Sequence, residues 1–183
     1  MPIFVGTSDI DDIRVGDDSS IFHSVWKGST RIWARPLLYT LTVGVAPNYT
    51  GSGTYVKYGF GEEGGTAFGS IGFVSGHNQL TSDWFKDEGG VSHSSSIIEL
   101  YYQEDVQNNL DKVLLRVDSS STSDKILNSD DAFSRLTIGN TVYNRTDASY
   151  SSNSSRSFWF WGGSTNPFGT TNGAVKNIRF DKP

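Results

Sequence analysis

The sequence contains no cysteine. This absence excludes disulfides, thiolate metal ligands and a cysteine nucleophile, so the fold must be held by packing, strand pairing or oligomerisation. The sequence also has no apolar run as long as a membrane-spanning helix, and its N-terminus lacks a basic segment followed by an apolar one. We therefore expect neither membrane insertion nor export by the standard secretion route.

Positive charge is also scarce. Fifteen Lys and Arg residues stand against 20 Asp and Glu residues, which gives a net charge of −5, and the basic residues do not cluster along the chain. Binding to nucleic acid depends on a positive field that displaces counterions from the phosphates. The composition therefore argues against a nucleic acid as partner.

Glycine and aromatic residues are plentiful instead. The 183 residues, sufficient for one ordinary domain, include 20 Gly, and aromatic residues make up 13% of the chain. This composition suits many short strands joined by turns, and no amphipathic helical stripe is present. Short strands at regular spacing predict an all-β fold, a β-sandwich or jelly-roll, in which residues 80–88 form the only plausible helical turn.

The C-terminal part of the chain has the clearest strand pattern. Residues 133–143 alternate between apolar and polar types around Gly139 and Asn140, which predicts a β-hairpin. An aromatic strand at 157–161, a turn at 166–169 and a last strand at 174–180 follow. Earlier strands are expected at 37–44, 54–60, 67–74 (bent by its glycines), 96–102 and 112–117, the last two paired with each other. Loops are expected at 45–53, 118–129 and 146–157.

Residues 1–35 have a different rhythm. Three times a Gly closes a short apolar strand, a polar turn follows, and an Ile opens the next strand, in a degenerate repeat of about ten to twelve residues. Each unit is too short to bury a face alone, so the ladder needs a neighbour to pack on. We expect an attachment arm at 1–35 and a sandwich domain at 36–183, with the boundary at Pro36.

Two sets of motifs carry a resemblance to a known family. The first is the strand ladder of the arm, with its Val5-Gly6, Val15-Gly16 and Val25-Trp26-Lys27-Gly28-Ser29-Thr30 segments. The second lies in the sandwich and comprises Tyr58-Gly59, Gly69-Ser70-Ile71, Leu136-Thr137-Ile138-Gly139, Tyr143-Asn144-Arg145-Thr146-Asp147-Ala148, Trp159-Phe160-Trp161 and Asn166-Pro167-Phe168-Gly169. The ladder resembles the N-termini of tailed-bacteriophage structural proteins, and the second set is similar to an uncharacterised domain of phage and prophage virion proteins. The resemblance implies a virion component and carries over no catalytic residue.

The aromatic side chains are the candidate contact residues. Sugar rings stack on aromatic faces, and aromatic residues often anchor interfaces. Alternation along the strand places Trp159 and Trp161 on one face and leaves open whether that face is core or a binding platform. Trp84 and Phe85 lie in a polar turn, and Asn166 is a polar neighbour for a bound glycan.

Candidate metal and catalytic residues are weaker. Asp118, Asp124, Asp130 and Asp131 are possible oxygen ligands for calcium, but they lack the alternating acidic spacing of a calcium loop and suit a solvated loop. The three histidines have no metal-site spacing. Glu99 with Glu104 or Asp105 is the one imaginable glycosidase pair, and nothing in the pattern selects it. We expect no cofactor, no metal and no enzymatic activity.

The interpretation that we adopt is a non-enzymatic phage structural protein, made in the host cytoplasm and assembled into the virion, at the tail or tail tip. The arm would dock onto other virion proteins or onto further copies of the chain in a homo-oligomer. The interface would bury the apolar residues of the arm, Phe4, Ile13, Phe22, Trp26 and Trp33. Two alternatives remain: an adhesin that binds a glycan of the host surface, and a decoration protein of the phage head.

Overall fold

The computed structural model describes residues 24–27, 30–34, 36–48, 54–73, 95–106, 108, 110–119, 133–153 and 156–181. The strands in chain order are β1 (Ser24–Lys27), β2 (Thr30–Ala34), β3 (Leu37–Thr42), β4 (Gly44–Asn48), β5 (Tyr55–Glu63), β6 (Thr66–Phe68), β7 (Ser70–Phe73), β8 (Ser95–Asp105), β9 (Lys112–Ser119), β10 (Arg135–Ile138), β11 (Thr141–Asn144), β12 (Ser149–Asn153), β13 (Arg156–Gly162) and β14 (Val175–Asp181). The one helical element among the described residues is a short 3-10 turn, η2 (Arg145–Asp147).

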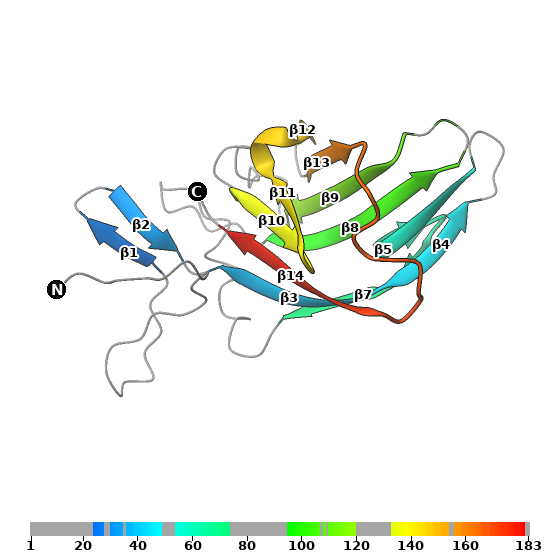
Figure 1. The fold of residues 1–183 in the computed structure, drawn as a ribbon, viewed down its shortest axis with the longest axis horizontal. Helices are drawn as coiled ribbons and strands as arrows, with labels where there is room; N and C mark the ends of the chain where they lie inside the picture. The colour runs from blue at the N-terminus through cyan, green and yellow to red at the C-terminus, as the bar shows by residue number, and fades with distance from the viewer. Residues whose placement is uncertain are drawn as a thin grey trace.

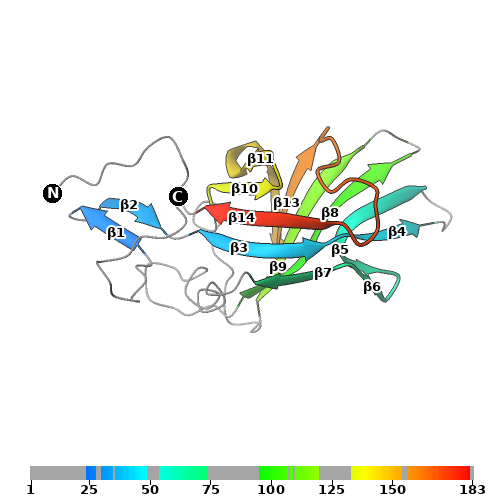
Figure 2. The ribbon, with the colours of Figure 1, turned by 60° about the horizontal axis from the view of Figure 1, so that its bottom comes forward.

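These strands form an all-β sandwich, as the sequence predicts. One sheet has five strands in the order β11-β10-β14-β3-β7. The other has seven, in the order β12-β13-β9-β8-β5-β4, with β6 paired to β5. All the pairings are antiparallel. The two sheets lie one over the other (Figures 1 and 2).

The hairpin of β1 and β2 belongs to neither sheet of the sandwich. Its strands are antiparallel, with an irregularity between Val25 and Trp26. In Figures 1 and 2 it lies beyond the end of the sandwich at which β3 begins and β14 finishes. Pro36 stands between β2 and the first strand of the sandwich, which begins at Leu37.

The core fills the space between the sheets. The five-stranded sheet contributes side chains such as Leu41, Leu136, Ile138, Ile178 and Phe180, and the seven-stranded sheet contributes Leu100, Val113, Leu115, Trp159 and Trp161. Phe133, just before β10, lies at the centre of an aromatic group, with its ring centroid 5.2 Å from that of Trp159 and 5.7 Å from that of Phe180. Burying such large apolar side chains is the main stabilising term of the fold.

Two stretches of chain leave one sheet for the other at the same point. The strand that begins as β3 continues as β4 in the seven-stranded sheet, and β6 of that sheet continues as β7 in the five-stranded one. Gly44 and Gly69 meet at this crossing, and Gly69 has a φ of 64°, which side chains disfavour. The sequence predicts one bent strand at 67–74, and the bend is in fact a change of sheet at Gly69.

The predicted hairpin at 133–143 is confirmed, with Leu136 paired to Tyr143 and the turn at Gly139 and Asn140. The pairing of 96–102 with 112–117 is confirmed as that of β8 with β9. The three predicted loops were wrong in part, since β4 occupies Gly44–Asn48, β9 continues to Ser119 and β12 occupies Ser149–Asn153. The predicted helical turn at 80–88 lies outside the described residues.

Candidate functional site

The face of the seven-stranded sheet that points away from the core carries two ion pairs, a pocket and a pair of stacked aromatic rings. We call it the outer face. Alternation along the strands places here the side chains of Tyr55, Lys57, Glu99, Tyr101, Leu114, Arg116, Phe158 and Phe160, between inward-pointing neighbours. Four buried residues on this face, Ala46, Phe68, Tyr101 and Leu114, form a small second apolar cluster, against which Phe160 packs.

The hairpin of β5 and β6 folds back over part of this face. β5 pairs with β8 as far as Phe60 and with β6 from Gly61 onward. The Nζ atom of Lys57 lies 2.6 Å from Oε2 of Glu63, six residues along the same strand. In a straight strand these Cα atoms would be about 20 Å apart, so the strand must bend between them. Gly59 and Gly61 lie in this segment, and a side chain at Gly59 would overlap the β8 backbone.

Hydrogen bonds and charges hold this hairpin in place. Glu63 accepts a hydrogen bond from the Tyr55 hydroxyl at 3.0 Å in addition to its ion pair with Lys57. The Lys57 ammonium also lies 4.6 Å from the centroid of the Tyr101 ring, in cation–π geometry. Since Lys57 is 8% exposed, its charge requires such compensation to be stable at this position.

A second ion pair lies further along the outer face. Nη1 of Arg116 is 3.5 Å from Oε2 of Glu99, and Oε1 of Glu99 accepts a hydrogen bond from the backbone N–H of Glu62 at 3.3 Å. Glu99 is itself buried, with 8% of its surface exposed. In the described part of this face, the two buried charges, on Lys57 and Glu99, are therefore matched by an opposite charge and anchor the hairpin.

Burial shifts the acidity of several tyrosines. The pKa of Tyr101 is raised well above its ordinary value, first by burial and then by the negative charges of Glu99 and Glu63. Burial also raises the pKa of Tyr102 to about 12, with a further contribution from Asp111. These phenols therefore remain protonated at neutral pH.

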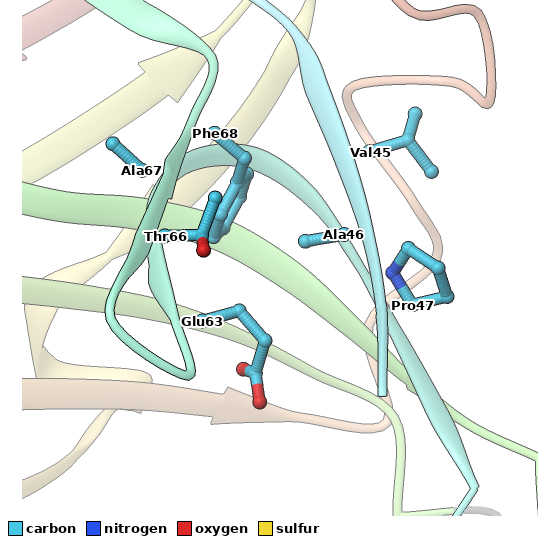
Figure 3. A pocket seen from close by; sticks show the side chains of 7 residues that line it. All are labelled: Val45, Ala46, Pro47, Glu63, Thr66, Ala67 and Phe68. Carbon is cyan, nitrogen blue, oxygen red and sulfur yellow. The ribbon is translucent and has the colours of Figure 1, made fainter. Parts of the chain in front are cut away.

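A pocket of about 340 Å³ lies between β4 and the β5–β6 hairpin. Val45, Ala46 and Pro47 line it from β4, and Glu63, Thr66, Ala67 and Phe68 line it from the hairpin (Figure 3). Its lining is mostly apolar, with the Glu63 carboxylate and the Thr66 hydroxyl as the polar groups. The volume is within the range of small-ligand pockets, although the Glu63 carboxylate already has Lys57 and Tyr55 as partners.

Phe158 and Phe160 form the aromatic feature of the opposite half of the outer face. Their rings are parallel within 8°, with centroids 6.2 Å apart, and both side chains are half-buried. The Nζ atom of Lys112 lies 5.7 Å from the centroid of the Phe160 ring. On the other side, Ser149 and Ser151 of β12 stand opposite the two rings in the strand register, and both are exposed.

The structure places one face of this aromatic strand in the core, a point that the sequence left open. Trp159 and Trp161 are 1% and 4% exposed and lie in the core, so neither ring is accessible for stacking on a glycan. The indole N–H of Trp161 donates a hydrogen bond to the Asn144 carbonyl at 2.8 Å. Phe158 and Phe160 point outward instead. Side chains alternate between the two faces of a strand, so the inward position of Trp159 and Trp161 implies the outward position of their neighbours.

The other predicted contact residues are distributed as follows. The amide of Asn166 closes the turn it belongs to, since its Oδ1 accepts from the N–H of Phe168 and its Nδ2 donates to the Gly169 carbonyl. Trp26 and Trp33 lie in β1 and β2, and the structure does not describe their side chains. The remaining predicted residues, Phe4, Ile13, Phe22, Trp84 and Phe85, lie outside the described residues.

The imagined glycosidase pair does not come together. Glu99 lies on the outer face, whereas Glu104 accepts a hydrogen bond from the hydroxyl of Tyr58, whose side chain packs in the core. Asp105 shares the face of Glu99 but is six residues away along β8, or about 20 Å, whereas glycosidase carboxylates lie within about 10 Å of each other. Neither partner of Glu99 is placed to act with it on one glycosidic bond.

Within the described ranges, no group of three or more His, Asp or Glu side chains is arranged to hold a metal ion. The structure does not describe the three histidines. It also leaves undescribed the side chains of the candidate calcium ligands Asp118, Asp124, Asp130 and Asp131.

No helix in the described part of the chain is long and apolar enough to cross a membrane. No family model, curated protein or solved structure matches the chain.

Proposed function

We propose that the protein is a non-enzymatic structural component of a tailed-bacteriophage virion, in the tail or tail tip, which attaches through its N-terminal arm. The observation that carries the proposal is the separation of the β1–β2 hairpin from both sheets of the sandwich. The resemblance of residues 1–35 to the N-termini of phage structural proteins supports the same role. The partners would be other virion proteins and further copies of this chain.

The hairpin offers a physical route to assembly. Among the described residues, β1 and β2 pair only with each other, so each has an edge that can accept a further strand. Addition of a strand satisfies the backbone groups of both partners, and apolar side chains then add burial and specificity. Trp26 and Trp33 lie on these two strands and would supply large apolar side chains to the interface.

The test compares the full-length protein with a variant that carries Trp26→Lys and Trp33→Lys, and with residues 36–183 alone. Light scattering gives the mass in solution, and incorporation is measured in virions assembled in infected cells. We expect an oligomer for the full-length protein, a smaller species for both altered chains, and no incorporation of either. Circular dichroism should show the same strand content for the variant and the parent chain.

Normal incorporation of the chain that lacks residues 1–35 would overturn the proposed attachment. The control is Val175→Lys, an exposed position on β14 in the sandwich, 61% exposed. This substitution adds a charge without touching the arm, so it should leave both mass and incorporation unchanged.

A further inference from the structure

The half-buried pair of Phe158 and Phe160 distinguishes the outer face from an ordinary solvated sheet surface. Two parallel phenyl rings side by side on a strand leave apolar area in contact with water. A solvated sheet face usually carries polar side chains at such positions. Grouped aromatic side chains that keep partial exposure are typical of binding surfaces.

Hydrogen-bonding groups surround the ring pair. In the strand register Arg116 stands beside Phe158 and Leu114 beside Phe160, while Ser151 and Ser149 stand on the other side. The Lys112 ammonium lies over the Phe160 ring. The serine side chains are short and exposed, so the rings remain open toward β12. A ligand that lies on the rings would meet hydroxyl, ammonium and guanidinium groups at its rim.

The charges of this face indicate what kind of ligand fits. Arg116 is paired with Glu99, and Lys57 with Glu63, so these two cations are already neutralised by the protein. A polyanion such as nucleic acid would need cations without such partners, and the chain as a whole has a net charge of −5. The chemistry suits a neutral molecule that combines flat C–H faces with many hydroxyl groups.

We propose that the outer face of the seven-stranded sheet binds a neutral oligosaccharide, with Phe158 and Phe160 as the stacking platform and Lys112, Arg116, Ser149 and Ser151 as hydrogen-bonding partners. The ammonium and guanidinium groups donate to the hydroxyl oxygens of a sugar, and the serine hydroxyls both donate and accept. The half-buried rings contribute C–H stacking, which neutral sugars offer on their apolar faces.

The geometry favours an elongated chain over a single sugar. Phe158 and Phe160 lie two residues apart on β13, with ring centroids 6.2 Å apart, so a chain that runs along the strand can place a sugar on each ring. The exposed Ser149 and Ser151 of β12 follow the same line. Leu114 and Tyr101, further across the sheet, are buried against Phe68 and end the accessible surface on that side. This site lies in the sandwich and does not depend on the arm, so each proposal can fail without the other.

The test is an array of neutral oligosaccharides (glucans, galactans, mannans and chitooligosaccharides), with uronic-acid oligosaccharides from alginate beside them, probed with the full-length protein. We expect saturable binding to at least one neutral oligosaccharide. The tightest binder is then titrated calorimetrically, and Phe158→Ala and Phe160→Ala should each weaken it by about tenfold. Val142→Ala is the matched control, since it trims an exposed apolar side chain on the other sheet.

A second variant keeps the test valid if loss of a ring weakens folding. Ser151→Arg changes an exposed position, and its long side chain would cover the ring of Phe158. We expect this variant to lose binding at an unchanged melting temperature. The proposal is overturned if no neutral oligosaccharide binds with a Kd below about 1 mM. Binding of uronic-acid oligosaccharides alone, or equal binding by the parent chain and Ser151→Arg, would also overturn it.

Discussion

Gly44 and Gly69 meet backbone to backbone where the chain passes between the two sheets. A Cβ atom on Gly44 would lie 2.7 Å from the Cα of Gly69, which is closer than such atoms approach in proteins. A Cβ on Gly69 would in turn lie 2.8 Å from the carbonyl oxygen of Thr42. The contact lets two strands change sheet side by side, so both sheets depend on it.

The first prediction is that Gly69→Ala strongly destabilises the protein. The new methyl group would overlap backbone atoms that have no room to move, and the φ of 64° adds strain for a side chain. We expect a loss of about 3 kcal/mol or more in the free energy of unfolding, measured in urea. Gly139→Ala separates the two causes, because Gly139 has a similar φ of 58° but open space around it, and should lose only about 1 kcal/mol. Equal losses would contradict the steric argument.

The sequence predicted the parts of this fold that depend on local signals. The hairpin around Gly139 and Asn140 follows from its turn residues, and the strands at 96–102 and 112–117, predicted to pair, are β8 and β9. β4 was missed because Pro47 is typical of a loop. In the structure this strand lies at the edge of the sheet, where a missing N–H is tolerated.

The candidate site was harder to predict because it depends on contacts between distant parts of the chain. Nothing local indicates that Glu63 returns to Lys57, since the contact requires the bend in β5 and the fold-back of the hairpin. Glu99 and Arg116 come together only through the register of β8 and β9. The sequence identifies the alternating aromatic strand, but which side of it faces inward depends on the second sheet, which packs over Trp159.

The second prediction concerns the two sides of that strand. Trp159→Ala should reduce the free energy of unfolding by about 3–5 kcal/mol, because it leaves a cavity beside Phe133 and Tyr150. Phe158→Ala, one position away on the outer face, should cost about 1 kcal/mol, since its ring is already partly in water. Urea unfolding of the two variants under the same conditions gives the comparison, and a larger cost for Phe158→Ala would reverse the assignment of the faces.

The third prediction is that Lys57 and Glu63 are coupled. Removing either partner leaves a poorly hydrated charge, so Lys57→Met and Glu63→Gln should each reduce the free energy of unfolding by about 2 kcal/mol. The double variant should cost less than the sum of the two, because neither charge is then left unpaired. The check is a double-mutant cycle from urea unfolding. Strict additivity would mean that the ion pair does not hold the hairpin.

The fourth prediction is a loss of stability at high pH. Burial raises the pKa of Tyr143 to about 12, and that of Tyr102 to about 12, whereas tyrosine in an unfolded chain ionises near pH 10. Below pH 10 these two groups are protonated in both states and do not affect stability. Above pH 10 the unfolded state releases protons that the folded state keeps, so stability falls between pH 10 and 12. Each tyrosine contributes a slope of up to about 1.4 kcal/mol per pH unit, which urea unfolding at stepped pH would measure.

Tyr143→Phe isolates one of these groups. The Tyr143 hydroxyl is buried with no hydrogen-bond partner among the described residues, so its removal should leave stability at pH 7 equal or raise it by up to about 1 kcal/mol. The variant should also lose stability less steeply above pH 10, because one raised pKa is gone. Tyr58→Phe is the control, since its hydroxyl donates to Glu104 at 3.2 Å and its removal deletes a hydrogen bond. A Tyr143→Phe variant that is less stable than the parent at pH 7 would show that the hydroxyl is hydrogen-bonded in solution.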